Sequence, residues 1–171
     1  GLGGHCIPID PYYLSWKLKT LDYDARFIKL AGEINTQMPR HIIDLIGSSL
    51  NESKKSINGS NILIIGAAYK ANINDYRESP AIDIIQLLRE SGSKVDFYDT
   101  YIETLEFSNL TLKGLENIRP EKLEIYDATV IVTDHKEVDY ELIRNHSSKI
   151  IDTRNVYKNV NDPKIKRLGQ G

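Results

Sequence analysis

The sequence predicts an α/β fold in which a long helical segment precedes a parallel, doubly wound sheet. Over residues 57–171, short apolar runs alternate with helical patterns, and this repetition is typical of parallel strands covered by helices on both faces. Over residues 1–56, apolar residues recur every three or four positions, as they do on one face of a helix. We therefore expect two parts, residues 1–56 and residues 57–171, separated by the polar stretch 51–56.

Two helices are expected in the first part. Pro11 directly follows Asp10, which predicts a helix that starts with Asp10 as its N-cap and runs to Lys19. A longer helical pattern covers residues 24–49, with a kink or break at Pro39. Its apolar stripe comprises Phe27, Leu30, Ala31, Ile34, Met38, Ile42, Leu45, Ile46 and Leu50. Because little chain is present to cover this stripe, we expect it to pack on another part of a longer protein or on a second subunit. Packing on the following domain is the alternative.

The second part is expected to alternate strands with helices. The predicted strands are Asn61–Ile65, Lys94–Tyr98, Ala128–Thr133 and Lys149–Asp152. One helix opens at Ser79-Pro80 and ends at Gly92, and a second lies around residues 140–145. Residues 100–126 show no clear pattern, and the basic Lys164–Arg167 segment is interpreted as a solvated tail.

Composition excludes several classes of protein. The chain carries 22 Lys and Arg against 24 Asp and Glu, without the basic excess that nucleic-acid binding requires. Its apolar runs are far shorter than the ~20 residues of a membrane-spanning helix, and no secretory signal is present. The single Cys6 fits a reducing compartment. We therefore expect a cytoplasmic protein that binds neither nucleic acid nor membrane.

The first ten residues have the composition of a working loop rather than of a chain end, so we expect the chain to be cut from something longer. Cys6 lies between glycines and a helix N-terminus, whose dipole favours the thiolate. Asp10 could orient a water or accept a proton near the sulfur. A lone cysteine is more often inert and buried, which is the alternative. His5 is a less favoured base, because the side chains of adjacent residues usually diverge.

Three cationic side chains follow predicted strands. Lys70 and Arg77 come after the first strand and Arg154 after the last, and ligands of open α/β sheets lie beyond the carboxyl ends of the strands. Together they could hold a diphosphate. Neither G-x-G-x-x-G nor G-x-x-x-x-G-K-[ST] is present, so the ordinary dinucleotide and Walker motifs are missing. The alternative without a ligand is that Arg77 pairs with Glu78 at the surface.

These motifs resemble the UDP-glucose/GDP-mannose dehydrogenase family. Residues 1–14 resemble its catalytic cysteine loop, residues 66–80 resemble the signature that opens its third domain, and residues 133–135 and 152–155 resemble later motifs. The cysteine loop and residues 26–35 look most similar to UDP-N-acetylglucosamine 6-dehydrogenases, with the UDP-N-acetylmannosamine enzymes as near alternative. The resemblance implies a Rossmann-like UDP-binding domain at residues 57–171. It also implies that the NAD-binding domain is missing and that the long helix forms a homodimer.

The resemblance further implies the chemistry. Cys6 would capture an aldehyde formed at C6 of the sugar, and Asp10 would orient the water that releases the acid, with NAD as the oxidant. The positions matching substrate-binding residues are Gly3, Tyr69, Lys70 and Arg154, and Arg77 would reach NAD from a partner chain. No metal site is implied, and this chain alone is expected to be inactive. The alternatives are a non-catalytic module that binds UDP and dimerises, and a cysteine hydrolase.

Overall fold

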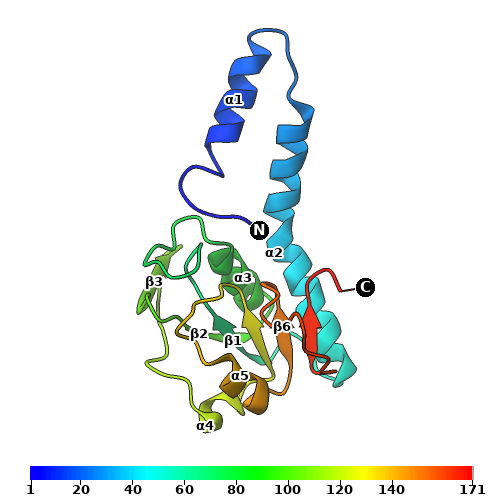
Figure 1. Cartoon of the computed structure of the whole chain (residues 1–171), viewed down its shortest axis with the longest axis vertical. Coiled ribbons are helices and arrows are strands. Elements are labelled where there is room, and N and C mark those ends of the chain that lie inside the picture. The colour runs from blue at the N-terminus through cyan, green and yellow to red at the C-terminus, as the bar shows by residue number, and fades with distance from the viewer. Residues whose placement is uncertain (171) are drawn as a thin grey trace.

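The computed structural model describes residues 1–170 and has the α/β architecture predicted from the sequence (Figure 1). The helices are α1 (Asp10–Lys19), α2 (Arg26–Glu52), α3 (Pro80–Glu90), α4 (Pro120–Leu123) and α5 (Tyr140–His146). The strands are β1 (Asn61–Ile65), β2 (Lys94–Tyr98), β3 (Thr104–Phe107), β4 (Leu110–Lys113), β5 (Ala128–Ile131), β6 (Ile150–Asp152) and β7 (Ile165–Arg167). None of the helices among residues 1–170 combines the length and apolar character that a membrane crossing requires.

Five parallel strands form the main sheet in the order β2-β1-β5-β6-β7. The chain moves from β1 to β2 on one side and returns to β5 on the other, so β1 and β5 flank the point where the direction of winding reverses. Ligands of open α/β sheets bind near this switch point. The loops after β1, β5 and β6 are therefore the first place to look for a functional site.

Apolar side chains cover both faces of the sheet. Alternate residues of β1 enter opposite cores: Ile62 and Ile64 face one cluster, which includes residues of α2 and α3, and Leu63 and Ile65 face the other, which includes residues of α4 and α5. All four are fully buried. Burial on both faces explains why the central strands consist of continuous apolar residues.

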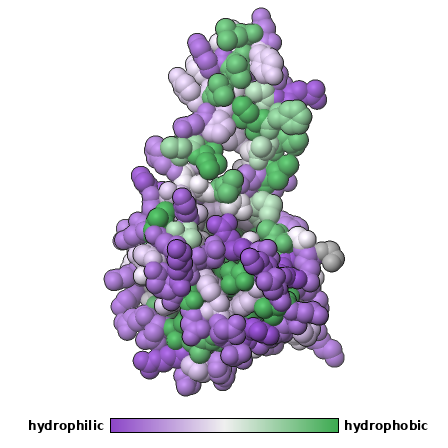
Figure 2. Space-filling model, viewed as in Figure 1, coloured by the Kyte–Doolittle hydropathy of each residue, from purple (hydrophilic) through white to green (hydrophobic). Residues whose placement is uncertain are grey.

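The long apolar stripe has two environments. Its C-terminal half packs on the sheet domain, where Ile42, Ile46 and Leu50 are almost completely buried, as the alternative interpretation of the sequence had it. The N-terminal half projects from the domain beside α1 as a two-helix arm (Figure 1). There Phe27 and Ile34 are 88% and 53% exposed. Apolar side chains gather on this arm, whereas the surface of the sheet domain is mostly polar (Figure 2).

Several local predictions need correction. Asp10 is the first residue of α1 and not its cap: the N-cap is Ile9, whose apolar side chain accepts no hydrogen bond, and the Asp10 amide donates to the Cys6 carbonyl at 2.8 Å. Of the kink or break expected at Pro39, the break does not occur, because α2 continues through this residue. The Lys164–Arg167 segment is not a solvated tail, since it contains β7, whose Ile165 is buried against β6. Residues 100–126 contain the β3–β4 hairpin and α4.

Candidate functional site

A cleft of about 200 Å³ lies beyond the carboxyl ends of β1, β5 and β6. Its polar wall combines Tyr69 from the loop after β1, Thr133 from the loop after β5, and Thr153 and Arg154 from the loop after β6. The opposite wall is apolar and comes from α2, α3 and the first residues of the chain. That wall consists of Leu2, Pro39, Ile42, Pro80 and Ile84. The cleft is thus formed where the sheet, the long helix and the N-terminal loop meet.

Arg154 is the cation that lines this cleft. Asp152 at the end of β6 accepts the Arg154 backbone amide at 3.0 Å, which fixes the start of the loop. The Arg154 side chain is 29% exposed, and its Nε lies 3.6 Å from a carboxylate oxygen of Asp134. This pair is loose, so the guanidinium keeps donors for an anion in the cleft. Thr153 donates its hydroxyl to the Ile131 carbonyl at 2.7 Å and is therefore held by the sheet.

Lys70 and Arg77 lie outside this cleft. Both are exposed residues of the loop between β1 and α3. The Arg77 guanidinium is bound to Asp75, with Nη2 2.7 Å from one carboxylate oxygen, and not to Glu78. These hydrogen bonds hold the pKa of the Asp75 carboxyl below its usual range. The three predicted cations therefore follow strands at one edge of the sheet, but only Arg154 lines the described cleft.

The N-terminal glycines press against the loop that follows β1. A Cβ placed on Gly3 would lie 2.1 Å from the Glu78 carbonyl oxygen, and one on Gly4 would lie 2.9 Å from the Tyr69 ring. Only glycine allows such close contact with backbone and ring. The loop is also tied to α2, because Asn35 accepts the Leu2 amide at 2.6 Å and donates to the Leu2 carbonyl at 2.8 Å. Gly3 thus joins the cysteine loop to the cleft wall.

Cys6 and Asp10 are exposed on the turn that leads into α1. The Cys6 carbonyl accepts amides of Ile9 and Asp10, which forms this turn. His5 Nδ1 lies 4.0 Å from the Cys6 sulfur, so these adjacent side chains do approach each other, contrary to the expectation from the sequence. Neither Cys6 nor Asp10 lines the cleft described above. The thiol is accessible, as a nucleophile must be.

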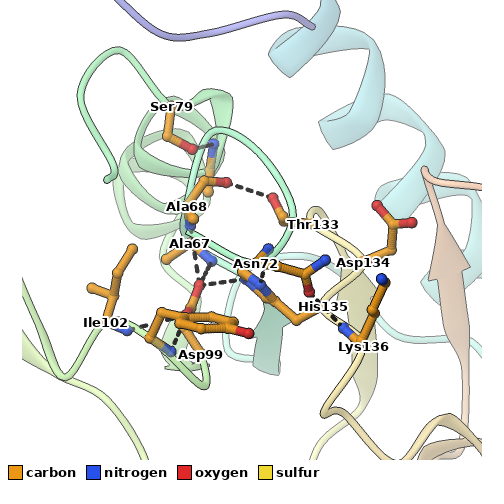
Figure 3. A network of polar contacts seen from close by, with 12 residues as sticks. Ala67, Ala68, Asn72, Ser79, Asp99, Ile102, Thr133, Asp134, His135 and Lys136 are labelled. Carbon is orange, nitrogen blue, oxygen red and sulfur yellow. Dashed lines mark hydrogen bonds and ion pairs between the residues drawn. The ribbon is translucent and has the colours of Figure 1, made fainter. Parts of the chain in front are cut away.

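The structure also reveals a buried polar network that the sequence reasoning missed (Figure 3). Asp99, directly after β2, and His135, after β5, are both fully buried, and their side chains are 2.9 Å apart. Burial raises the pKa of Asp99, but hydrogen bonds from His135 and from the backbone amides of Tyr101 and Ala67 outweigh it and leave the pKa below its usual value. The position of a carboxylate at the end of a predicted strand was the signal that could have identified Asp99.

This network occupies the switch point itself. Asp99 accepts the amides of Ala67 and Ala68, the turn where a dinucleotide-binding sheet holds phosphate. Thr133 donates to the Ala68 carbonyl at 2.6 Å and thereby closes the loop of β1 onto the loop of β5. The amides of Ala67 and Ala68 are therefore not free to bind a phosphate at this edge. Within residues 1–170, no group of three or more His, Cys, Asp or Glu is arranged to hold a metal ion.

A second cavity is apolar and lies in the arm. Its volume is about 680 Å³, and it is formed between the cysteine loop, α1 and the exposed half of α2. Ile7, Tyr12 and Phe27 are among its lining residues, and each is more than two-fifths exposed. The absence of charged side chains from its lining makes it unsuited to a phosphate, and it is better suited to apolar side chains.

An open parallel sheet with helices on both faces, and a polar cleft beyond its carboxyl ends, defines a doubly wound α/β ligand-binding domain. Residues 63–159 match the UDP binding domain of the UDP-glucose/GDP-mannose dehydrogenase family, and residues 1–37 match the central domain of that family. The chain therefore belongs to the UDP-glucose/GDP-mannose dehydrogenase family, a family of oxidoreductases.

Individual relatives agree with this assignment. The chain is 34% identical to a UDP-N-acetyl-D-mannosamine dehydrogenase of Methanococcus maripaludis, covering 100% of the chain and 40% of the relative. It is 28% identical to a UDP-N-acetyl-D-glucosamine 6-dehydrogenase of Salmonella typhi, covering 80% and 32%. The structure of a UDP-D-ManNAc dehydrogenase from Pyrococcus horikoshii superposes with a TM-score of 0.78 at 31% identity, covering 99% of this chain and 39% of that one. The chain thus spans about 40% of the length of the relatives it matches.

Proposed function

We propose that this chain is the C-terminal part of an NAD-dependent dehydrogenase that oxidises C6 of a UDP-N-acetylhexosamine to the uronic acid. Within it, residues 57–171 would bind the UDP-sugar, and residues 1–56 would supply the cysteine loop and the end of a central domain. The observation that carries the proposal is the contact of Gly3 and Gly4 with the loop after β1. Through this contact, the segment that bears Cys6 meets the wall of the cleft that contains Tyr69 and Arg154.

In the proposed substrate site, Arg154 binds the diphosphate inside the cleft. Tyr69 and Gly3 shape the wall between the diphosphate and the cysteine loop, and the exposed Lys70 closes on the ligand from the loop. The cleft of about 200 Å³ is smaller than the ~300–1,000 Å³ of ordinary cofactor pockets. A UDP-sugar therefore needs further walls, which we expect from the remainder of the protein.

The proposed chemistry of this chain begins after the C6 alcohol has been oxidised to an aldehyde. The Cys6 thiolate adds to the aldehyde carbon and forms a thiohemiacetal, which a second oxidation converts to a thioester. Water held by Asp10 attacks the thioester carbonyl, which releases the uronic acid and returns the thiol. The exposure of both side chains on one turn leaves them accessible to a substrate that enters beside the arm.

NAD would accept the two hydrides of this reaction. Residues 1–170 do not form a complete NAD site, because the amides of Ala67 and Ala68 are bound to Asp99 and the G-x-G-x-x-G motif is missing. We therefore assign NAD to a domain outside residues 1–171. Arg77, whose side chain is 67% exposed, is the residue of this chain that could reach NAD from a partner subunit.

A homodimer through α2 belongs to the same proposal. Phe27, Leu30 and Ile34 leave an exposed apolar stripe on the N-terminal half of α2, and stripes of this kind mark protein interfaces. Sedimentation of the full-length protein tests this part. A dimer that dissociates in Phe27→Asp supports it, and a monomeric wild-type protein contradicts it.

Substrate and cofactor are tested together with the full-length protein, NAD and either UDP-N-acetylglucosamine or UDP-N-acetylmannosamine. We expect two NADH per sugar from one of them. Both sugars are tested because relatives of both names match the chain. In Cys6→Ser we expect no release of uronic acid, while the neighbouring Ile9→Val keeps the wild-type rate. Undiminished release from Cys6→Ser would exclude Cys6 as nucleophile.

The second candidate is a non-catalytic module that binds UDP and dimerises. It is favoured by the match of residues 63–159 to a UDP binding domain without a complete NAD site in this chain. No NADH from any UDP-sugar, together with retained binding of UDP, would support this module. A cysteine hydrolase would have to use His5, whose Nδ1 lies 4.0 Å from the Cys6 sulfur, because His135 is buried and bound to Asp99 and His146 is bound to Glu124.

A further inference from the structure

The buried Asp99 carboxylate is the centre of a network that reaches three loops. Its Oδ2 accepts the amides of Ala67 at 2.6 Å and Ala68 at 3.0 Å, and its Oδ1 accepts those of Tyr101 and Ile102 at 2.7 and 3.1 Å. His135 Nε2 donates to the same carboxylate at 2.9 Å. Five donors on a fully buried carboxylate define its position and its charge.

His135 extends this anchoring to the middle of the loop after β1, residues 66–79. Its Nδ1 accepts the Asn72 amide at 3.0 Å. Since Nε2 faces a carboxylate and Nδ1 faces an N–H donor, these bonds assign the neutral tautomer with its proton on Nε2. Asn72 has a positive φ of 63° and is held a second time, because its Oδ1 accepts the Lys136 amide at 2.9 Å.

The segment with Tyr69 and Lys70 is therefore held by hydrogen bonds on both sides. Asp99 holds the preceding residues Ala67 and Ala68, and His135 holds the following residue Asn72 (Figure 3). Asp99 and His135 are also bonded to each other. We infer that Asp99 and His135 are positioning residues that hold Tyr69 and Lys70 in place for the nucleotide diphosphate. This inference rests on the proposed function, because it needs a UDP ligand at the cleft.

Two substitutions at position 135 separate positioning from stability. Gln places its amide near Nε2 and can still donate to Asp99, but it leaves the Asn72 amide without an acceptor. Asn places its oxygen near Nδ1 and keeps the bond to Asn72, but it loses the bond to Asp99. If the position of the loop decides affinity, His135→Gln must weaken UDP binding more than His135→Asn, whichever protein is the less stable.

The experiment measures the Kd of UDP by titration calorimetry, and Tm, in the full-length protein. We expect about tenfold weaker binding in His135→Gln, because the Asn72 amide loses its acceptor and the segment that it holds is released. In His135→Asn we expect a loss of less than threefold. Asp127→Asn is the matched control, because Asp127 also accepts a backbone amide, that of Asn61 at 2.8 Å, at the opposite end of β1. It should lower Tm without changing the Kd.

Each outcome decides the inference. Wild-type affinity in His135→Gln, or equal losses in Gln and Asn variants, would overturn the positioning role and leave the proposed function intact. A wild-type protein that does not bind UDP would overturn both. If substitution at position 135 prevents folding, Asn72→Gly replaces it, because it removes the bond to Lys136 and tolerates the positive φ. We expect Asn72→Gly to bind UDP about threefold more weakly, and unchanged affinity would refute the role.

Discussion

The contact between Gly3 and Glu78 makes Gly3→Ala the sharpest test of how the cysteine loop is held. The added Cβ would lie 2.1 Å from the Glu78 carbonyl oxygen and 3.0 Å from Pro80 Cδ. Since real Cβ atoms are essentially never closer than 3.0 Å to such atoms, the two segments must separate by about 0.9 Å. The obstacle is backbone, so rotation of a side chain cannot relieve it.

A separation of this size moves the loop that carries Cys6 away from the wall formed by Tyr69. We expect kcat/KM of the full-length protein for its UDP-sugar to fall by roughly 100-fold, because ~1 Å of displacement costs about that much in a positioned site. Overpacking should also lower the free energy of unfolding by roughly 1–3 kcal/mol. Initial rates of NADH formation and urea denaturation measure the two effects separately.

Gly47→Ala is the matched control. Its Cβ would meet the flexible end of Ile57 at 3.2 Å, within α2 and away from the cleft. In a helix this substitution should stabilise by up to ~1 kcal/mol, and kcat/KM should stay at the wild-type value. A Gly3→Ala protein with kcat/KM within twofold of wild type would refute the argument that close backbone contact positions the cysteine loop.

Three further predictions follow from burial and hydrogen bonding. Ile46→Ala should lower the free energy of unfolding in urea by about 2–5 kcal/mol, because Ile46 is fully buried. Phe27→Ala on the same helix should lower it little, since Phe27 is 88% exposed. Equal losses would contradict the division of α2 into a buried and an exposed half. Thr133→Val should lower the free energy of unfolding by about 1–3 kcal/mol, since the Ala68 carbonyl loses a buried donor, and no loss would argue against the loop closure. The lowered pKa of Asp99 stabilises the fold above the unfolded pKa of ~3.9, and this stabilisation disappears as the pH falls through the folded pKa. The difference in free energy of unfolding between wild type and Asp99→Asn should therefore shrink below pH ~4. A difference that stays constant with pH would contradict a native carboxylate.

Local pattern was sufficient for much of the fold. β1 and β2 have the predicted bounds, because buried parallel strands consist of continuous apolar residues. Ser79 caps α3 and accepts the Ala81 amide, as its position before Pro80 predicts. The β3–β4 hairpin was missed although its turn, Ser108-Asn109, has positive φ angles at both residues. Such a turn favours asparagine, and Asn109 was the available signal.

The candidate site was less accessible from the sequence. The family resemblance implied Tyr69, and the place after a predicted strand indicated Arg154; the structure places both in one cleft. The same reasoning grouped Lys70 and Arg77 with Arg154, but the loop turns both side chains to the surface and pairs Arg77 with Asp75. Sequence position fixes which strand a residue follows. It does not fix the direction of a side chain in a loop of fourteen residues, residues 66–79.

The sequence by itself determined the parallel sheet, the helices that cover it and the family motifs, because periodicity, caps and turns act over a few neighbouring residues. Only the tertiary structure decided that Asp99 and His135 close the switch point and that half of α2 packs on the sheet while the other half is exposed. It also brought Gly3 against Glu78, 75 positions further along the chain. These contacts join residues that are distant in sequence, and their energy depends on how separate elements pack rather than on any local pattern.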